Sequence, residues 1–140
     1  MDTRRRDPGI LTGVDICRPE RIKKAILRYG DRFLRRVFTS GEIERCASRP
    51  NPYQCYAARF AAKEAAMKVL GAGVFDIGFS SVEVINEGTG KPFLNFQGRA
   101  RQRADDLGIY KADISLSHEK DIAIAMAVAL TDRPPASGSE

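Results

Sequence analysis

The order of apolar and polar residues divides the chain into a helical first half and a mostly β second half. Residues 10–16 form an apolar run broken by one acid, Asp15, which is typical of a buried strand with that aspartate at or near its end. A helix is expected to begin near Pro19 and to stop at Gly30. Its apolar positions follow the i, i+3, i+4, i+7 spacing, and its basic positions share another face: Ile22, Ala25, Ile26 and Tyr29 against Arg21, Lys24 and Arg28.

Two further helices are predicted before residue 71. Residues 39–42 have the S/T-x-x-E form of a capping box and open a short helix that ends before Pro50 and Pro52. A long helix runs from about residue 53 to 70, with Gly71 as its C-terminal stop.

The long helix carries a glutamate in an unexpected place. Phe60, Glu64 and Lys68 recur every fourth residue and share one stripe, among strong helix formers. Apolar neighbours replace part of the hydration of the Glu64 carboxylate, so it needs hydrogen bonds or a cation. Lys68, one turn later, is the simple candidate partner, and a bound metal ion is the other.

Strands dominate the second half. Residues 82–86 and 92–96 flank 87–91 and predict a hairpin, and the Gly-Thr-Gly-Lys segment within it lacks the spacing of a phosphate-binding loop. A helix is expected from about 98 to 107, followed by an alternating strand, 114–119, that contains the only histidine, His118. In the last strand, 122–130, alanines alternate with bulky residues. This small face admits either a helix of the same chain or a second subunit.

Composition indicates one domain without a membrane anchor. At 140 residues the chain can bury one core. It has no long apolar stretch and no signal peptide, so we expect a soluble cytoplasmic protein with no membrane insertion. The three cysteines, Cys17, Cys46 and Cys55, form no CxxC pair and no even set, and are predicted to be small apolar residues in a reducing cytosol. Residues 1–8 and 131–140 are predicted to be disordered tails.

The net charge of +5 is unevenly distributed. Residues 18–49 hold ten basic against four acidic residues, a local +6. A basic face of this kind predicts an acidic partner, which is a nucleic acid, an anionic membrane surface or an acidic protein, unless the face is merely solvated.

Five segments carry a family resemblance: 13–16, 38–43, 59–68, 90–92 and 115–119. In order and approximate spacing they resemble holo-[acyl-carrier-protein] synthase, the short type of 4′-phosphopantetheinyl transferase, over roughly residues 10–130. The resemblance implies an α+β domain over residues 9–130, with helices packed on a small antiparallel sheet. It also implies a cytoplasmic enzyme of fatty acid biosynthesis and lipid metabolism.

The resemblance implies a specific reaction. A serine of apo-acyl carrier protein attacks the diphosphate of coenzyme A, takes the 4′-phosphopantetheine arm and releases adenosine 3′,5′-bisphosphate, with Mg²⁺ as cofactor. Asp15 and Glu64 match the metal ligands and, with Lys68, the catalytic residues. Lys63, Lys68, Gly71 and His118 match cofactor-binding positions. The proton acceptor stays open among Glu64, Asp15 and a metal-bound water.

The resemblance also implies two kinds of partner. The basic helix matches the family's docking site for the acidic carrier protein, at Arg21, Ile22, Ala25 and Arg28, although Cys17-Arg18-Pro19 departs from the usual residues before it. The longer transferases build one site between two similar halves, and this chain has the length of one half. We therefore expect a homotrimer with active sites between subunits, and the alanine face of the last strand is a candidate contributor to the interface.

Two other functions compete with the transferase. A small basic nucleic-acid-binding module would explain the local charge, but the chain has no zinc spacing, no aromatic RNA-binding signature and no tryptophan. Asp15 and Glu64 would then lack a role, so no nucleic-acid partner is expected. A noncatalytic regulator that binds coenzyme A would keep the lysines but would need no metal pair.

Overall fold

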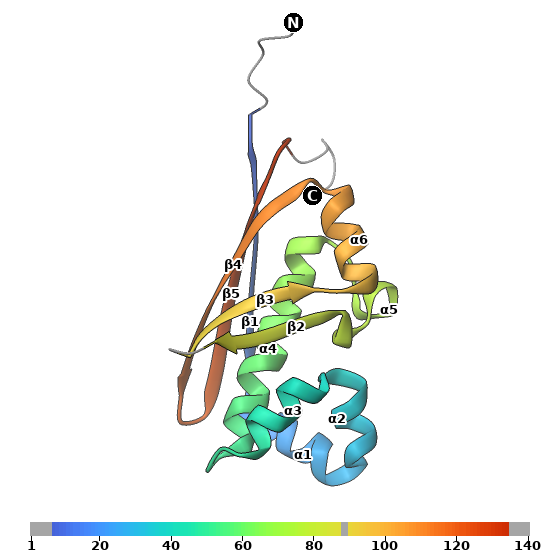
Figure 1. The fold of residues 1–140 in the computed structure, drawn as a ribbon. Helices are drawn as coiled ribbons and strands as arrows, with labels where there is room; N and C mark the ends of the chain where they lie inside the picture. Colours follow the sequence, from blue (N-terminus) through green and yellow to red (C-terminus); the bar gives the residue numbers. More distant parts are fainter. Residues whose placement is uncertain (1–6, 88–89, 135–140) are drawn as a thin grey trace, which may run out of the picture.

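The protein is an α+β domain in which one long helix packs on a three-stranded antiparallel sheet (Figure 1). The computed structural model describes residues 7–87 and 90–134. The larger sheet has the order β1-β5-β4, formed by Gly9–Cys17, Ile122–Thr131 and Ile109–Glu119. A separate hairpin pairs β2 (Val82–Glu87) with β3 (Lys91–Phe96), as predicted. The predicted fold class is confirmed.

The helices begin and end close to the predicted positions. They are α1 (Pro19–Tyr29), α3 (Ser40–Ala47), α4 (Pro52–Leu70) and α6 (Gly98–Asp106). Thr39 and Glu42 form both bonds of the predicted capping box. Three short elements were not predicted from the sequence: α2 (Asp31–Val37), α5 (Val74–Ile77) and the 3₁₀ turn η1 (Phe79–Ser81). Helices α1 to α3 gather at one end of the molecule (Figure 1).

Two predictions about strands and tails need correction. Strand β1 was predicted to be buried, but only its inner face is buried or half-buried, and Ile10, Val14 and Ile16 are exposed. The C-terminal tail was predicted to start at residue 131, yet Thr131 is buried and ends β5. Of the predicted tails, residues 1–6 and 135–140 lie outside the described part of the chain, as do residues 88 and 89 of the predicted hairpin loop.

The alanine face of β5 packs against α4 of the same chain. All four of its alanines are buried: Ala123, Ala125, Ala127 and Ala129. Gly13 on the neighbouring strand shows how closely the layers approach, because a Cβ there would lie 2.0 Å from the carbonyl oxygen of Ala65 on α4. The alanine face is therefore internal: of the two predicted alternatives, a helix of the same chain covers it, and its suggested contribution to a subunit interface is wrong.

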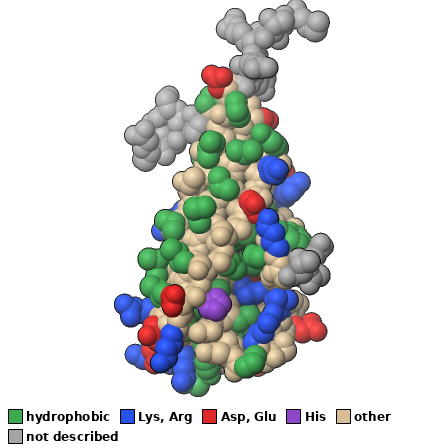
Figure 2. Space-filling model, turned by 90° about the vertical axis from the view of Figure 1, so that its left-hand side faces the viewer, with side chains coloured by type: hydrophobic (Ala, Val, Ile, Leu, Met, Phe, Trp, Pro, Cys, Tyr) green, Lys and Arg blue, Asp and Glu red, His purple; other side chains and the backbone are tan. Residues whose placement is uncertain are grey.

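The opposite face of the sheet is the exposed one. Its large apolar side chains include Val14 and Ile16 on β1 and Ile124 and Met126 on β5. Figure 2 shows hydrophobic side chains in a band along this face. A contiguous apolar band on one face of a sheet is typical of a surface that a second chain covers.

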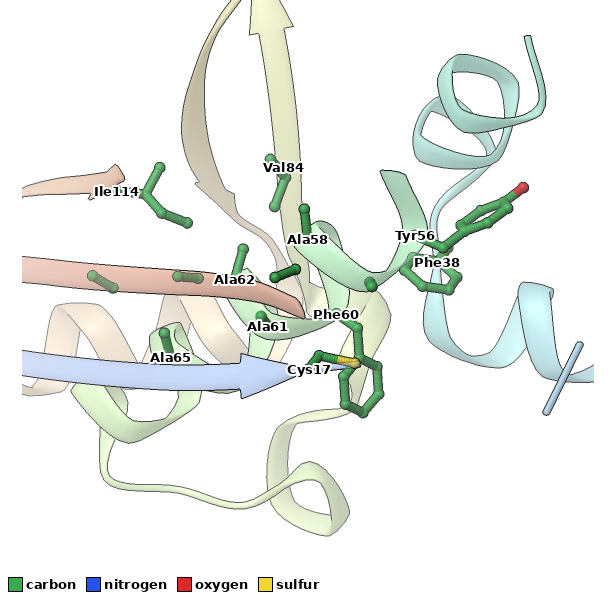
Figure 3. Close-up of a cluster of buried hydrophobic side chains, with 14 of the residues drawn as sticks. Cys17, Phe38, Tyr56, Ala58, Phe60, Ala61, Ala62, Ala65, Val84 and Ile114 are labelled. Atoms are coloured by element: carbon green, nitrogen blue, oxygen red, sulfur yellow. The ribbon is translucent and has the colours of Figure 1, made fainter. Parts of the chain in front are cut away.

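The core lies between α4, the sheet and the helices α1 to α3. Aromatic rings close its lower part, where the ring centroids of Phe38 and Tyr56 are 4.9 Å apart (Figure 3). Alanines of α4, such as Ala61 and Ala65, fill the narrow space against the sheet. This packing fixes the rotation of α4 about its own axis, and with it the direction in which the face that carries Glu64 points.

The cysteines differ from the prediction. Cys17 is a buried free thiol, as expected of a small apolar residue. Cys46 and Cys55 instead form a disulfide, with their Cα atoms 5.3 Å apart, that joins the end of α3 to the start of α4. The prediction of three unpaired cysteines is therefore wrong, because the turn between the two helices brings positions 46 and 55 together.

In the described part of the chain, no helix combines the length and apolar character needed to span a bilayer.

Candidate active site

Three predicted site residues come together where β1 packs on α4. The ammonium group of Lys68 donates a hydrogen bond to the Val14 carbonyl at 2.8 Å and lies 3.8 Å from a carboxylate oxygen of Asp15. Glu64, one turn before Lys68, lines a shallow cavity with Lys68 and Gly71. Gly71 ends the helix in the left-handed conformation, with φ of +64°, and so turns the backbone at the edge of this cavity.

The electrostatics of this site favour a bound cation. Burial raises the pKa of Glu64, and the charge of Asp15 raises it further, while Arg21 and Lys68 act in the opposite direction. A metal ion stabilises the charged form of a carboxylate whose ionisation is disfavoured by burial and by a neighbouring carboxylate. The described residues hold no cluster of three or more candidate metal ligands. This donor set therefore suits an ion that takes its remaining ligands from water and substrate, as Mg²⁺ does.

Lys68 affects Glu64 through its charge but does not form the predicted close helical ion pair with it. It reaches across to β1, and a Glu64–Lys68 pair is not among the ion pairs between described residues. Its side chain is 56% exposed, so the ammonium group stays accessible beside the two carboxylates. A cation in this position can contact an anionic substrate.

Lys63 does not fit its predicted role at the cofactor. Its side chain is fully buried and its ammonium group lies 2.7 Å from the carboxylate of Glu42, which is buried as well. It also donates hydrogen bonds to the carbonyls of Phe79 and Val82. With three oxygen partners and no access to solvent, Lys63 is not free to contact a phosphate. Its role is to join α4 to α3, η1 and β2.

His118 lies apart from Asp15. It is on β4 and Asp15 is on β1, the two outer strands of the sheet, with β5 between them. Two strand spacings correspond to about 10 Å. The histidine lines a different cavity, of about 500 Å³, which also contacts the start of α4, β3 and the α3–α4 turn. Figure 2 shows the histidine in purple, near Lys and Arg side chains.

This second cavity is lined by three arginines that were not predicted as site residues: Arg45, Arg49 and Arg59. Burial, with repulsion from Arg45, lowers the pKa of Arg59 to about 10, so the guanidinium stays charged at neutral pH. The Nε atoms of Arg45 and Arg59 are buried and have no hydrogen-bond partner among the described residues. Several cationic side chains that line one cavity are suited to a phosphate. One sequence feature could have indicated this cavity: Arg59 is a charged residue directly before an apolar helical run.

The predicted docking helix α1 presents its basic face to solvent. Arg21 and Arg28 are exposed and Ala25 is half-buried. Ile22 is only 2% exposed and faces the core, so its predicted contact with a partner is wrong. Arg21 also reaches the active site, since its guanidinium lies 5.5 Å from the ring centroid of Phe60, one turn before Glu64.

Comparison with known proteins agrees with this geometry. Residues 12–127 match the model of the 4′-phosphopantetheinyl transferase superfamily. The chain belongs to this superfamily. It is 45% identical over 128 residues to a holo-[acyl-carrier-protein] synthase of Herpetosiphon aurantiacus, an alignment that covers 86% of this chain and 98% of the relative. The resemblance seen in the five sequence segments is thereby confirmed.

Solved structures of the superfamily share the fold. The holo-[acyl-carrier-protein] synthase of Neisseria meningitidis superposes with a TM-score of 0.78 at 29% identity, over 85% of this chain and 96% of the other. The enzyme of Helicobacter pylori, solved in complex with coenzyme A, gives a TM-score of 0.75 at 28% identity, over 85% of this chain and 99% of the other.

Proposed function

We propose that this chain transfers the 4′-phosphopantetheine arm of coenzyme A to a serine of an apo-acyl carrier protein, with Mg²⁺ as cofactor. The observation that carries the proposal is the group of Asp15, Glu64 and Lys68 at the contact of β1 with α4. Two carboxylates and an accessible ammonium group form the kind of site that neutralises a diphosphate. The superfamily match and the relatives named holo-[acyl-carrier-protein] synthase support the same reaction.

In this reaction the serine oxygen forms a bond to the phosphorus that carries the pantetheine arm. The bond from that phosphorus to the bridging oxygen breaks, and adenosine 3′,5′-bisphosphate leaves. Lys68 is tied to the Val14 carbonyl and beside Asp15, so its ammonium group is held in place to stabilise charge on the diphosphate. The serine proton passes to a carboxylate of the site or to a water held there.

Asp15 and Glu64 are the residues that would hold Mg²⁺. Their oxygen donors and the raised pKa of Glu64 fit a cation between them. When bound, the ion supplies positive charge to the diphosphate oxygens and orients them.

The complete site needs two chains. The proposed diphosphate-binding residues, Asp15, Glu64 and Lys68, lie at β1. The arginine cavity with His118 lies at β4, on the opposite edge of the same sheet. A ring of three chains that buries the exposed apolar face can bring the first edge of one chain beside the second edge of its neighbour. His118 and the arginines then hold the adenosine end of coenzyme A while Lys68 and the carboxylates of the other chain hold its diphosphate.

The exposed basic face of α1 is the proposed docking surface for an acidic carrier protein in the cytoplasm. Arg28→Glu tests docking separately from the active site, because the charge of Arg21 also lowers the pKa of Glu64. The KM for the carrier should rise about five- to tenfold, less at high salt, while the KM for coenzyme A stays constant. The matched control is Arg101→Glu, the same charge change on α6. An unchanged carrier KM in Arg28→Glu would remove α1 from the docking surface.

Transfer from coenzyme A to an apo-carrier, assayed with and without Mg²⁺, tests the function. Asp15→Asn and Glu64→Gln should each lower kcat/KM by about a hundredfold or more, because each removes charge that the cation needs. Asp106→Asn, at an exposed position on α6, is the control. Tight binding of coenzyme A with no transfer would favour a noncatalytic regulator, and full activity of either variant at low Mg²⁺ would exclude that carboxylate as a ligand.

A further inference from the structure

The disulfide between Cys46 and Cys55 closes the segment that forms one wall of the arginine cavity. The two cysteines are nine positions apart, one at the end of α3 and the other in the first turn of α4. The closed segment contributes Arg49, Pro50, Asn51 and Gln54 to the cavity, along with Cys55 itself, and Arg45 directly precedes it. The cross-link therefore lies inside the wall of a proposed ligand site.

Little else fixes this wall. Residues 47–51 are all exposed, so they gain little from packing. Their polar contacts are mostly local, such as Arg49 N to Cys46 O at 3.1 Å and the Ser48 hydroxyl to Arg45 O at 2.9 Å. A covalent bond between the two ends restricts such a segment far more than these exposed hydrogen bonds do.

Repulsion among the arginines around the cavity opposes keeping the segment between the two cysteines close to Arg59. Arg45 and Arg49 both repel the buried Arg59, whose Nη1 donates to the carbonyl of Cys55 at 3.5 Å. An anion would offset this repulsion, and in its absence the cross-link restrains Arg49, which lies inside the closed segment, near Arg59. Without the disulfide the exposed segment can move outward and take Arg49 away from Arg45 and Arg59.

We propose that Cys46 and Cys55 form a reversible redox site that controls how tightly the arginine cavity binds a phosphate-bearing ligand. The ligand class rests on the proposed function. Reduction by a dithiol transfers two electrons and two protons to the disulfide, giving two cysteine thiols and the oxidised reductant, and a disulfide oxidant reverses it. Cys55 lines the cavity and Cys46 is fully buried, so the reductant attacks the sulfur of Cys55. In a reducing cytosol, a disulfide in this position is expected to be transient and regulatory.

The first test is a thiol count on the full-length protein. After denaturation, protein kept from reductant should show one thiol per chain, that of Cys17, and protein treated with dithiothreitol should show three. Three thiols in protein oxidised with excess glutathione disulfide would overturn the proposal, because the pair would then not form.

The second test measures ligand affinity in both states by calorimetry. Adenosine 3′,5′-bisphosphate is the probe, because coenzyme A has a thiol that would exchange with the disulfide. The oxidised protein should bind it at least about threefold more tightly, since its arginines are preorganised. Cys55→Ser and Cys46→Ala should both bind like the reduced protein whether or not dithiothreitol is present, and Cys17→Ser should keep the full redox response.

Equal affinities of the oxidised and reduced forms, in a protein that still transfers the arm, would overturn the redox proposal and leave the proposed function intact. Loss of the response in Cys17→Ser would likewise overturn it. Failure of both forms to bind the probe or to transfer the arm would refute the proposed function as well. Thermal unfolding of Cys55→Ser and Cys46→Ala shows whether each is folded, and agreement between the two variants excludes a local effect of either substitution.

Discussion

The buried pair of Lys63 and Glu42 should contribute more to stability than any exposed charge of the protein. The two side chains are fully buried and 2.7 Å apart, and Lys63 also donates to two backbone carbonyls. Lys63→Met keeps the length of the side chain but leaves the Glu42 carboxylate without its cation. An uncompensated buried charge costs about 3–5 kcal/mol. Backbone N–H groups of Thr39 and Val84 still donate to Glu42, so the lower part of that range is expected.

Equilibrium unfolding in urea, followed by circular dichroism at a fixed protein concentration, measures this effect. The concentration must be fixed because the unfolding of the proposed three-chain assembly would depend on it. Glu42→Gln combined with Lys63→Met removes both charges and keeps an acceptor for one of the two N–H groups. The double variant should lose at least about 2 kcal/mol less than the sum of the single losses.

Lys68→Met is the matched control on the same helix. Lys68 is 56% exposed, so its loss should change stability by less than about 1 kcal/mol while it strongly lowers transfer activity. If Lys63→Met also cost less than about 1 kcal/mol, the reasoning would be refuted, because Lys63 could not then be the buried partner of Glu42.

Three further predictions address the packing and titration of the site. Gly13→Ala should destabilise the protein by about 1–3 kcal/mol in thermal or urea unfolding, because its Cβ would meet a backbone oxygen at 2.0 Å; Gly41→Ala, with its nearest contact at 3.4 Å, should be tolerated. Burial raises the pKa of Cys17 to about 11, so iodoacetamide at pH 8 should label it only after unfolding, and rapid labelling of the native protein would contradict this burial. Burial and the neighbouring aspartate raise the pKa of Glu64, so an NMR titration of metal-free protein should show it protonating at a higher pH than an ordinary glutamate, whose value is 4.5. A midpoint at or below 4.5 would count against the paired carboxylates.

The helices and the main strands were predictable from the sequence because their signals are local. The capping box at Thr39 and Glu42 and the glycines after α1 and α4 act on backbone groups within a few residues. The alternation along β5 was also visible, since side-chain direction in a strand follows directly from position. The family resemblance added the site residues Asp15, Glu64 and Lys68, which the fold does bring together.

The tertiary structure alone decided which partner each face and each charge meets. The alternation in β5 could not tell whether its alanines face a helix or another subunit, and the close contact of Gly13 with Ala65 of α4 answers this. Lys63 and Glu64 are adjacent charged residues in the sequence, but one points into the core, toward Glu42, and the other lies near Asp15. No periodic pattern along α4 identifies Glu42 or Asp15 as a partner, because these residues lie on α3 and β1.

The same reason explains the cavity of arginines and the disulfide. Arg45, Arg59 and His118 come from α3, α4 and β4, and only the packing of these elements makes them one site. Cys46 and Cys55 pair because the turn between α3 and α4 brings their Cα atoms within 5.3 Å. Local hydrogen bonding thus determined which segments become helices and strands, whereas the packing of segments distant in sequence determined which side chains are buried, paired or available to a ligand.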